Sequence, residues 1–447
     1  MKQSIGLTEE LLRFIAVSPS PFHVVANFEK DLKRAGFQKL QEHESWKLAH
    51  GNKYYVTRND SSILAFCIPE TDPVNFQIIA SHSDSPAFKV KEHPEIGVCG
   101  KYVTLNVEKY GGMLCAPWFD RPLSIAGRVM VRGVDTIRMK LVDFDRDLVM
   151  IPNLAIHMNR EANEGYRYNA QKDMLPLLTM GEADGLLTGL LAKQLLVKPE
   201  DILSTDLFLY NRMYGSIWGA KEEFVSAPHL DDIQCAYASM CGLMDTDLLH
   251  GQNLSMCCVF DNEEVGSSTK QGADSTFLED VIERICLSMK WDTEKKYRML
   301  AQSFMLSADN AHAVHPNYPG KADPTNQPYL NEGIVLKYNA NQKYTTDAVS
   351  AAVFKEICRK AGVPVQTYVN RSDIAGGSTL GNIANRHVSL NTADIGLPQL
   401  AMHSPYETAG VKDTFYLYQA ACAFYRTTIS TGVNGISLTR VEQEGLS

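Results

Sequence analysis

Short apolar runs separated by amphipathic stretches fill the second half of the 447-residue chain. The apolar runs cover residues 253–260, 303–308, 333–338, 363–369 and 387–396. Stretches with helical spacing lie between and after them, at residues 231–249, 281–290 and about 408–427. Strands that alternate with helices in this way predict an α/β fold in which a sheet lies between layers of helices.

The first half begins with a well-marked helix. Ser20 is typical of an N-cap, Pro21 of the first helical position, and Gly36 of the residue after a helix end. Apolar residues at helical spacing lie between these signals, at Phe22, Val25, Phe28 and Leu32. Two β-rich runs follow at residues 76–80 and 102–107, each bounded by turn-forming residues, and both are predicted to be strands.

The middle of the chain has a different pattern of apolar and polar residues. Segment 126–133 alternates apolar and polar residues, while 159–173 is almost entirely polar, and neither continues the strand–helix alternation. We therefore predict a helix-layered, mixed-sheet α/β domain from residues 1–88 and 226–447, with a β-rich domain inserted between them at 89–225.

Composition excludes several classes of protein. Apolar residues make up 45% of the chain and charged residues 21%, which is typical of a folded globular protein. Lys plus Arg (43) minus Asp plus Glu (52) gives −9, which disfavours a nucleic-acid partner. No apolar run is long enough to span a membrane, and Glu9 and Glu10 interrupt any secretory signal, so we expect a cytoplasmic protein. The ten cysteines show no CxxC spacing, and we expect no disulfides.

The segment ASHSDSP carries the first candidate site. His82 and Asp84 are two residues apart at the end of an apolar strand, so both side chains should point the same way. An aspartate in this position can hold a metal-binding imidazole in one tautomer. The alternative is a structural histidine in a turn, and the motif alone favours that alternative.

The segment VFDNEEVGSS carries the second candidate site. Glu263 and Glu264 follow an apolar strand, where paired carboxylates are costly to bury unless a cation or a proton offsets their charge. A solvated helix N-terminus is the alternative, because acidic residues there interact favourably with the helix dipole.

Three further polar clusters follow predicted strands. They contain Asp231 and Asp232 (for which helix capping is the simpler explanation), Asp309 with His312 and His315, and His403. All five sites lie where strands end, which is the edge at which open α/β sheets bind ligands. Histidines and carboxylates without cysteine suit zinc, manganese or cobalt. Two metals sharing one carboxylate would use five ligands and leave one glutamate as a base.

The chain resembles the M18 family of metalloaminopeptidases, of the aspartyl aminopeptidase type. The resemblance rests on ASHSDSPAFKVK, WFDRPLSIAGRV, LAIHMNR with NEG and QKDMLPLL, DNEEVGS, SADNAHAVHPNY and AMHS, in family order over nearly the whole chain. It implies two divalent ions per subunit, zinc foremost and cobalt or manganese as alternatives. It also implies the ligand set His82 and Asp309 for one ion, Glu264 and His403 for the other, and Asp231 between them.

The same resemblance assigns further roles. Glu263 would be the general base, Asp84 would orient His82, and Lys337 and Tyr344 would contact substrate. His157 would reach a neighbouring subunit's site from the inserted domain, in a homododecamer built from dimers with its sites facing an internal chamber. Lys337 could pair with the side chain of an N-terminal Asp or Glu; a solvated lysine is the alternative.

Two segments depart from the family pattern. Residues 370–383 lack the family's Cys and final Pro, and PYETAG follows AMHS where relatives more often carry Arg-Glu. The expected activity is hydrolysis of peptides from a free N-terminus. Because both departures lie near the substrate side of the family's site, the preference for acidic N-terminal residues is less firmly predicted than the hydrolytic reaction. The alternatives are a neutral Leu or Met preference, a related di-metal hydrolase of N-acyl amino acids, and a non-catalytic assembly protein on this scaffold.

Overall fold

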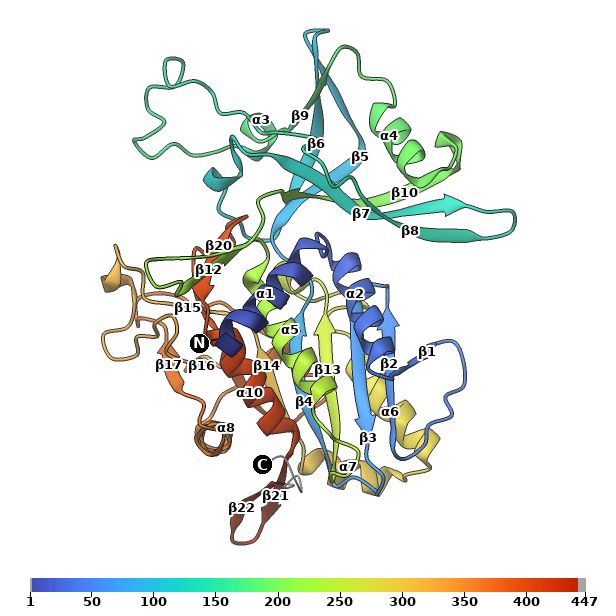
Figure 1. Cartoon of the computed structure of the whole chain (residues 1–447), viewed down its shortest axis with the longest axis vertical. Coiled ribbons are helices and arrows are strands. Elements are labelled where there is room, and N and C mark those ends of the chain that lie inside the picture. Colours follow the sequence, from blue (N-terminus) through green and yellow to red (C-terminus); the bar gives the residue numbers. More distant parts are fainter. Residues whose placement is uncertain (1, 441–447) are drawn as a thin grey trace.

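The computed structural model describes residues 2–440 and is built around a nine-stranded sheet (Figure 1). In spatial order its strands are β1 (Gln38–Leu40), β2 (Asn52–Arg58), β3 (Ser62–Ile68), β13 (Asn253–Phe260), β4 (Asn75–His82), β14 (Phe304–Ala308), β18 (Asn391–Gly396), β16 (Ile334–Tyr338) and β17 (Val365–Val369). The sheet is mixed, as predicted. The central strands β13, β4, β14 and β18 are mutually parallel, so their carboxyl ends meet at one edge.

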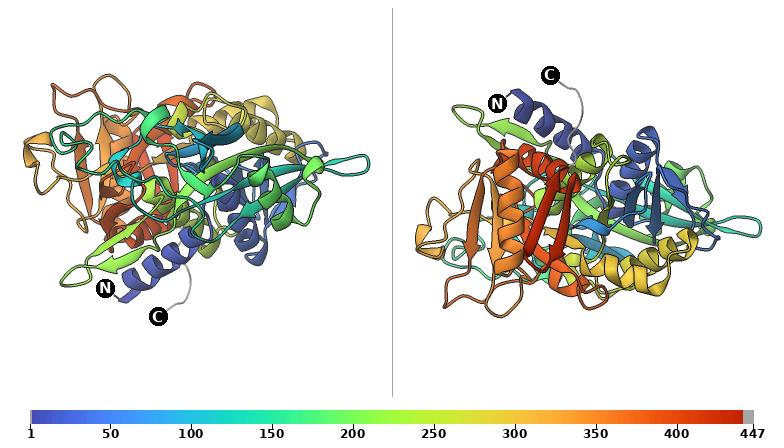
Figure 2. Two further views of the ribbon diagram at one scale, coloured as in Figure 1. Left: turned by 90° about the horizontal axis from the view of Figure 1, so that it is seen from above. Right: turned by 90° about the horizontal axis from the view of Figure 1, so that it is seen from below.

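Helices cover both faces of this sheet, which gives the predicted helix-layered α/β architecture (Figure 2). One face packs against α1 (Lys2–Ala16), α2 (Pro21–Arg34), α5 (Leu230–Asp245), α8 (Ala348–Ala361) and α10 (Asp413–Tyr425). The other packs against α6 (Phe277–Met289), α7 (Thr293–Ala301) and α9 (Leu380–Ala384). Strand β13 illustrates the alternation, because Cys257 and Val259 enter the first core while Met256 and Cys258 enter the second.

Two helix predictions need correction in detail. Helix α2 begins at Pro21 as expected, but the Ser20 side chain does not cap it and instead bonds His23 Nδ1 at 2.8 Å. The last helix begins at Asp413 rather than near residue 408. Residues Glu407–Gly410 form strand β20, which pairs with β12 (Phe224–Ala227), so long-range strand pairing takes precedence there over local pattern.

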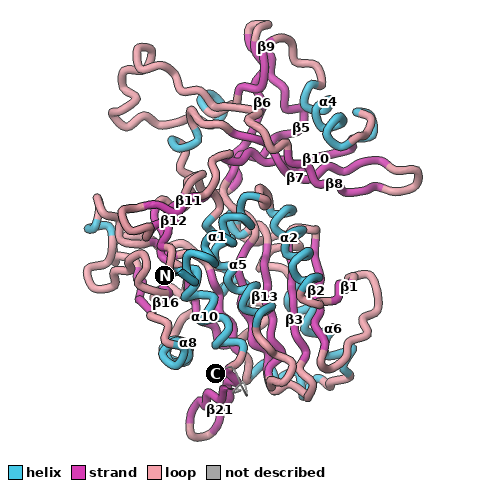
Figure 3. Tube along the Cα trace, viewed as in Figure 1, coloured by secondary structure: helices cyan, strands magenta, loops and turns pink. Residues whose placement is uncertain are grey.

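A second, six-stranded sheet lies above the carboxyl-end edge of the first (Figure 3). Its strands are β8 (Ile137–Asp143), β7 (Leu123–Arg132), β10 (Ile202–Asn211), β5 (Ala87–Val98), β6 (Tyr102–Tyr110) and β9 (Leu177–Met180). Helix α4 (Leu186–Leu195) and the short α3 (Ala170–Asp173) accompany it, over a core of its own. The sheet thus begins at Ala87 and ends at Asn211, and the domain boundaries at 89 and 225 stay a prediction.

A small sheet joins distant parts of the chain beside the carboxyl-end edge. Its order is β11 (Ser216–Trp218), β12, β20, β19 (Pro398–Leu400) and β15 (Ala311–His312). A hairpin of β21 (Thr427–Gly432) and β22 (Gly435–Arg440) follows α10. Within residues 2–440 all ten cysteines are free, and no described helix is long and apolar enough to cross a membrane.

Candidate metal centre

Three neighbouring strands deliver predicted ligands to one point. His82 is the last residue of β4, Asp309 directly follows β14, and Glu263 and Glu264 lie in a short 3₁₀ turn after β13. Because these strands are parallel neighbours, the polar residues after them are forced together.

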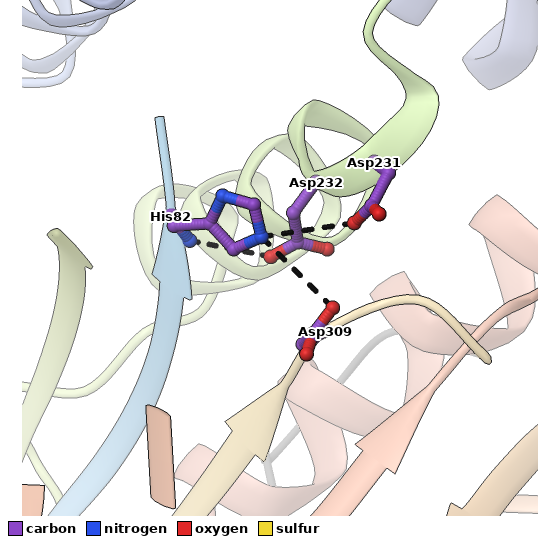
Figure 4. Close-up of side chains that lie close together, drawn as sticks. All are labelled: His82, Asp231, Asp232 and Asp309. Atoms are coloured by element: carbon purple, nitrogen blue, oxygen red, sulfur yellow. Dashed lines mark hydrogen bonds and ion pairs between the residues drawn. The ribbon is translucent and has the colours of Figure 1, made fainter. Parts of the chain in front are cut away.

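Segments that flank the small sheet carry the remaining predicted ligands. Asp231 lies in the first turn of α5, directly after β12, and His403 lies in the loop between β19 and β20. The structure therefore brings together all five residues expected to bind metal. Figure 4 shows His82 from β4, Asp231 and Asp232 from the start of α5, and Asp309 from the loop after β14 pointing toward one another.

Asp231 lies between two groups of side chains. Its Oδ1 is 3.6 Å from His82 Nε2, which is also 3.9 Å from Asp309 Oδ1. Its Oδ2 is 3.3 Å from His403 Nε2, which is also 3.3 Å from Glu264 Oε2. The two oxygens of one carboxylate thus face different histidines.

The donor set fits divalent cations. Imidazole nitrogens and carboxylate oxygens are ligands that zinc and related ions accept. The side chains of Asp231 and Glu264 are each 3% exposed, and Asp231 Oδ1 and Glu264 Oε1 are buried without a hydrogen-bond partner in the protein. Buried anionic oxygens without partners are costly, and a cation among them would offset that cost.

The protein's own charges already perturb these groups. Burial opposes ionisation of Asp231, but bonds to His403 and His82 outweigh it and lower its pKa. Burial likewise opposes the charged form of His82, yet Asp231, Asp309 and Asp84 raise its pKa well above the usual value. Burial, reinforced by Asp231, raises the pKa of Glu264 well above its usual range.

Asp84 lies behind His82, as the spacing predicted. Its Oδ1 is 3.4 Å from His82 Nδ1, and its backbone carbonyl lies 3.0 Å from the same nitrogen. The carboxylate also accepts hydrogen bonds from the backbone N–H groups of Glu263 (3.1 Å) and Glu264 (3.2 Å). Asp84 therefore contacts both an expected ligand and the turn that carries Glu263 and Glu264.

The capping explanation for Asp231 and Asp232 is wrong. His229 occupies the N-cap of α5, and both aspartates have non-helical backbone angles and are buried. Asp232 Oδ2 accepts the backbone N–H of His82 at 3.2 Å, which fixes the end of β4. The two adjacent aspartates thus have different neighbours, which sequence spacing left unresolved.

Glu407 was not singled out from the sequence. It is buried in β20, where one carboxylate oxygen accepts the backbone N–H of Asp231 at 2.9 Å and the other accepts that of His403 at 2.7 Å. Burial, with the Asp231 charge, raises its pKa to about 8. The only signal was its position in PYETAG, four residues after His403.

A cavity of about 320 Å³ opens beside the cluster. Its lining includes Glu263, His312, Lys337, Tyr344 and Tyr368. Lys337 is 2% exposed, so it is not a solvated lysine. Its Nζ donates to the Asp309 carbonyl at 2.7 Å, lies 3.5 Å from Asp309 Oδ2 and lies 5.3 Å from the Tyr344 ring centre.

His157 does not line this cavity. It lies in an exposed turn of the segment between β8 and β9, with Ile156 and Met158 also exposed beside it. Within one described chain it has no contact with the metal cluster. His315 lines a separate cavity together with Lys321 and Arg371.

Comparison with known proteins decides the family. Residues 14–425 match the family model described as aminopeptidase I zinc metalloprotease (M18). The chain belongs to the M18 aminopeptidase family. It is 46% identical over 433 residues to a probable M18 family aminopeptidase 2 of Clostridium novyi, covering 95% of this chain and 100% of that relative. The chain is accordingly a hydrolase of the metalloaminopeptidase type.

Solved structures agree with the fold. A chain of the Ape4 and Nbr1 complex superposes with a TM-score of 0.90 at 36% identity, covering 95% of this chain and 85% of that one. A chain of the S. cerevisiae mApe1 dodecamer gives 0.82 at 29% identity, covering 94% and 96%. The predicted α/β fold and the resemblance stated from the motifs are thereby confirmed.

Proposed function

We propose that the protein is a di-metal aminopeptidase that removes the N-terminal residue from peptides. The observation that carries the proposal is the position of Asp231, whose two carboxylate oxygens face His82 on one side and His403 on the other. A carboxylate between two such groups suits two ions better than one. His82 and Asp309 would hold one ion, Glu264 and His403 the other, and Asp231 both.

Glu263 and Asp84 would have the remaining roles in the reaction. Bound divalent ions would acidify a water and polarise the scissile carbonyl. Glu263 lines the cavity next to the expected ligands without being counted among them, so its carboxylate can take a proton from the attacking water and return it to the leaving amine. Asp84 would hold His82 in one tautomer through Nδ1.

A pair of variants separates base from ligand. Glu263→Gln should keep both ions and lower kcat by about 10²–10⁴-fold, the usual value of a positioned general base. Glu264→Gln makes the same chemical change one residue away and should lower metal content instead. Metal analysis and turnover must be measured on the same samples. An active Glu263→Gln enzyme would disprove the assignment, and loss of metal from it would mean that the two roles are exchanged.

The substrate must carry a free amine for this proposal to hold. A panel of peptides and their N-acetylated forms tests the point, because an N-acyl amino acid hydrolase with the same ligands would accept the blocked forms. Cleavage of both forms at equal rates would replace the aminopeptidase proposal with that alternative.

We also propose a preference for acidic N-terminal residues, supported by Lys337. Among the described residues that line the cavity, it is the one Lys or Arg side chain. The competing observation is its contact with Asp309, which engages the ammonium and favours a neutral preference. Rates of release of N-terminal Asp, Glu, Leu and Met distinguish an acidic from a neutral preference. With acidic preference, Lys337→Met should remove an advantage of about 1–3 kcal/mol in transition-state binding, the range of charge-assisted bonds.

Assembly is the last part of the proposal. We propose a cytoplasmic homododecamer of tetrahedral symmetry built from dimers, in which the partner's His157 completes each site. The dodecameric mApe1 relative, the exposed apolar residues beside His157 and the free thiols support it. Mixing His157→Ala subunits with Glu263→Gln subunits should restore activity above either parent, since each mixed dimer holds one complete site. Proven exchange without restored activity would end the shared-site idea.

A further inference from the structure

The inserted sheet contacts the metal cluster of its own chain. Strand β6 ends at Tyr110, and the residues that follow it lie against Glu264 and His403. Leu114 donates its backbone N–H to the carbonyl of His403 at 3.1 Å, and the Gly111 Cα lies close enough to Glu264 that an added Cβ would be 3.1 Å from Glu264 Cβ. The insertion is therefore part of the wall of the site.

Tyr110 makes the most specific of these contacts. Its hydroxyl lies 2.7 Å from Asp84 Oδ2. The same hydroxyl accepts a hydrogen bond from Asn262 Nδ2 at 2.8 Å. The Asn262 amide is itself oriented, because its oxygen accepts from Thr269 Oγ1 at 2.7 Å and Gln271 Nε2 at 2.8 Å. The Tyr110 proton is thus directed to Asp84.

The buried Asp84 carboxylate accepts three hydrogen bonds and lies 3.4 Å from a fourth donor, His82 Nδ1, whose own hydrogen bond goes to the Asp84 backbone carbonyl. Oδ1 faces His82 Nδ1 and the Glu263 N–H, while Oδ2 faces the Glu264 N–H and the Tyr110 hydroxyl. Three of these donors belong to the expected catalytic turn or ligand, and the Tyr110 hydroxyl is the one from the insertion. Removing it would leave Oδ2 with the Glu264 N–H as its single donor, so the carboxylate would be held less firmly in its present orientation.

We propose that Tyr110 is a positioning residue: through Asp84 it fixes the imidazole of His82 and the Glu263–Glu264 turn in the reactive geometry. The proposal rests on the function proposed above. Tyr110 does not line the cavity and acts only through Asp84. Its ring packs edge-on against Phe208, with centroids 5.5 Å apart, so the hydroxyl can be removed while the packing is retained.

The experiment compares Tyr110→Phe with Tyr102→Phe in the full-length, metal-loaded enzyme. Tyr102 is at the other end of the same strand, 45% exposed, and serves as the matched control. Tyr110→Phe should lower kcat about tenfold, with KM within about twofold, and weaken metal binding by a similar factor, as expected for a group that orients a ligand. Tyr102→Phe should leave all three unchanged.

A second variant guards against a folding defect. Asn262→Gly keeps the left-handed backbone at φ 62° but removes the amide that orients the Tyr110 hydroxyl, and should lower kcat in the same direction by less. A Tyr110→Phe enzyme with a lowered melting temperature but wild-type kcat at saturating metal would overturn the proposal, because that is the signature of a structural role. If the wild type releases no N-terminal residue, the proposed function fails instead.

Discussion

The substitution Gly111→Ala tests whether the insertion shapes the metal site. Gly111 has a left-handed φ of +77°, and a Cβ there would be 3.1 Å from Glu264 Cβ, 3.3 Å from the Glu264 carbonyl oxygen and 3.5 Å from Pro86 Cβ. Two costs are therefore expected: backbone strain in the alanine itself, and displacement of Glu264 by a few tenths of an ångström.

The magnitudes follow from these two costs. A non-glycine residue in the left-handed region costs about 1–2 kcal/mol of stability. The displacement of Glu264 adds to that, because Glu264 Oε2 is 3.3 Å from His403 Nε2 and ligand geometry tolerates little movement. Disturbing the groups that orient a metal ligand typically costs about 10–100-fold in affinity or activity. We expect the lower end, about tenfold, in metal affinity.

Gly100→Ala is the matched control. Gly100 has φ +64° in the β5–β6 turn of the same sheet, and a Cβ there would meet no atom within 4 Å. Urea unfolding of the metal-free proteins should show a similar loss of stability in both variants, whereas a metal titration should separate them. If both variants bind metal and turn over substrate alike, the reasoning about Glu264 is wrong.

Three further predictions concern metal and pH. His82→Ala should lose occupancy at one ion, because His82 supplies one of few ligands there; metal analysis of the purified protein checks this. Chelation should abolish hydrolysis and lower the melting temperature, since the clustered carboxylates would repel one another without a cation; adding metal back should reverse both. Burial lowers the pKa of His23 from 6.5 to about 4, so the folded state resists its protonation. Stability should therefore be full above pH 6.5 and fall as the pH drops toward 4, by about 1–2 kcal/mol at pH 5. His23→Gln should remove that part of the slope in urea unfolding at pH 7 and pH 5.

Local pattern predicted the central fold and placed candidate metal ligands at its edge, whereas the resemblance to the M18 family supplied their individual roles. Apolar strands ending in His82, Asp309 and the Glu263–Glu264 pair place these side chains at one edge once the strands are parallel neighbours. The spacing of apolar residues predicts where each strand ends, and the direction of the strand decides at which edge of the sheet its last residue lies. His403 was a candidate for the same reason, as a polar residue after a short apolar run, but spacing did not distinguish Asp231 from Asp232, and only the resemblance selected Asp231.

Pairing between distant segments was not predictable in this way. Residues from about 408 were expected to begin the last helix, but residues Glu407–Gly410 form β20, which pairs with β12, and the Glu407 carboxylate accepts two backbone N–H groups. The burial of Lys337 was equally hidden, because it depends on the Asp309 carbonyl, contributed by a neighbouring loop. In each case the decisive contact joins residues that local spacing does not relate.

The contacts of Tyr110 and Leu114 show that the insertion does more than offer a surface for another subunit. A domain that only dimerised could be removed or disordered without changing the ligands of its own chain. Here the Tyr110 hydroxyl contacts Asp84 and the Leu114 N–H contacts the carbonyl of His403, so the insertion supports residues of both ligand groups from within one chain. Loss of activity on deleting the insertion would consequently say nothing about subunit sharing. Only point variants such as His157→Ala, which leave residues 110–114 in place, can separate a contribution across the interface from support within the chain.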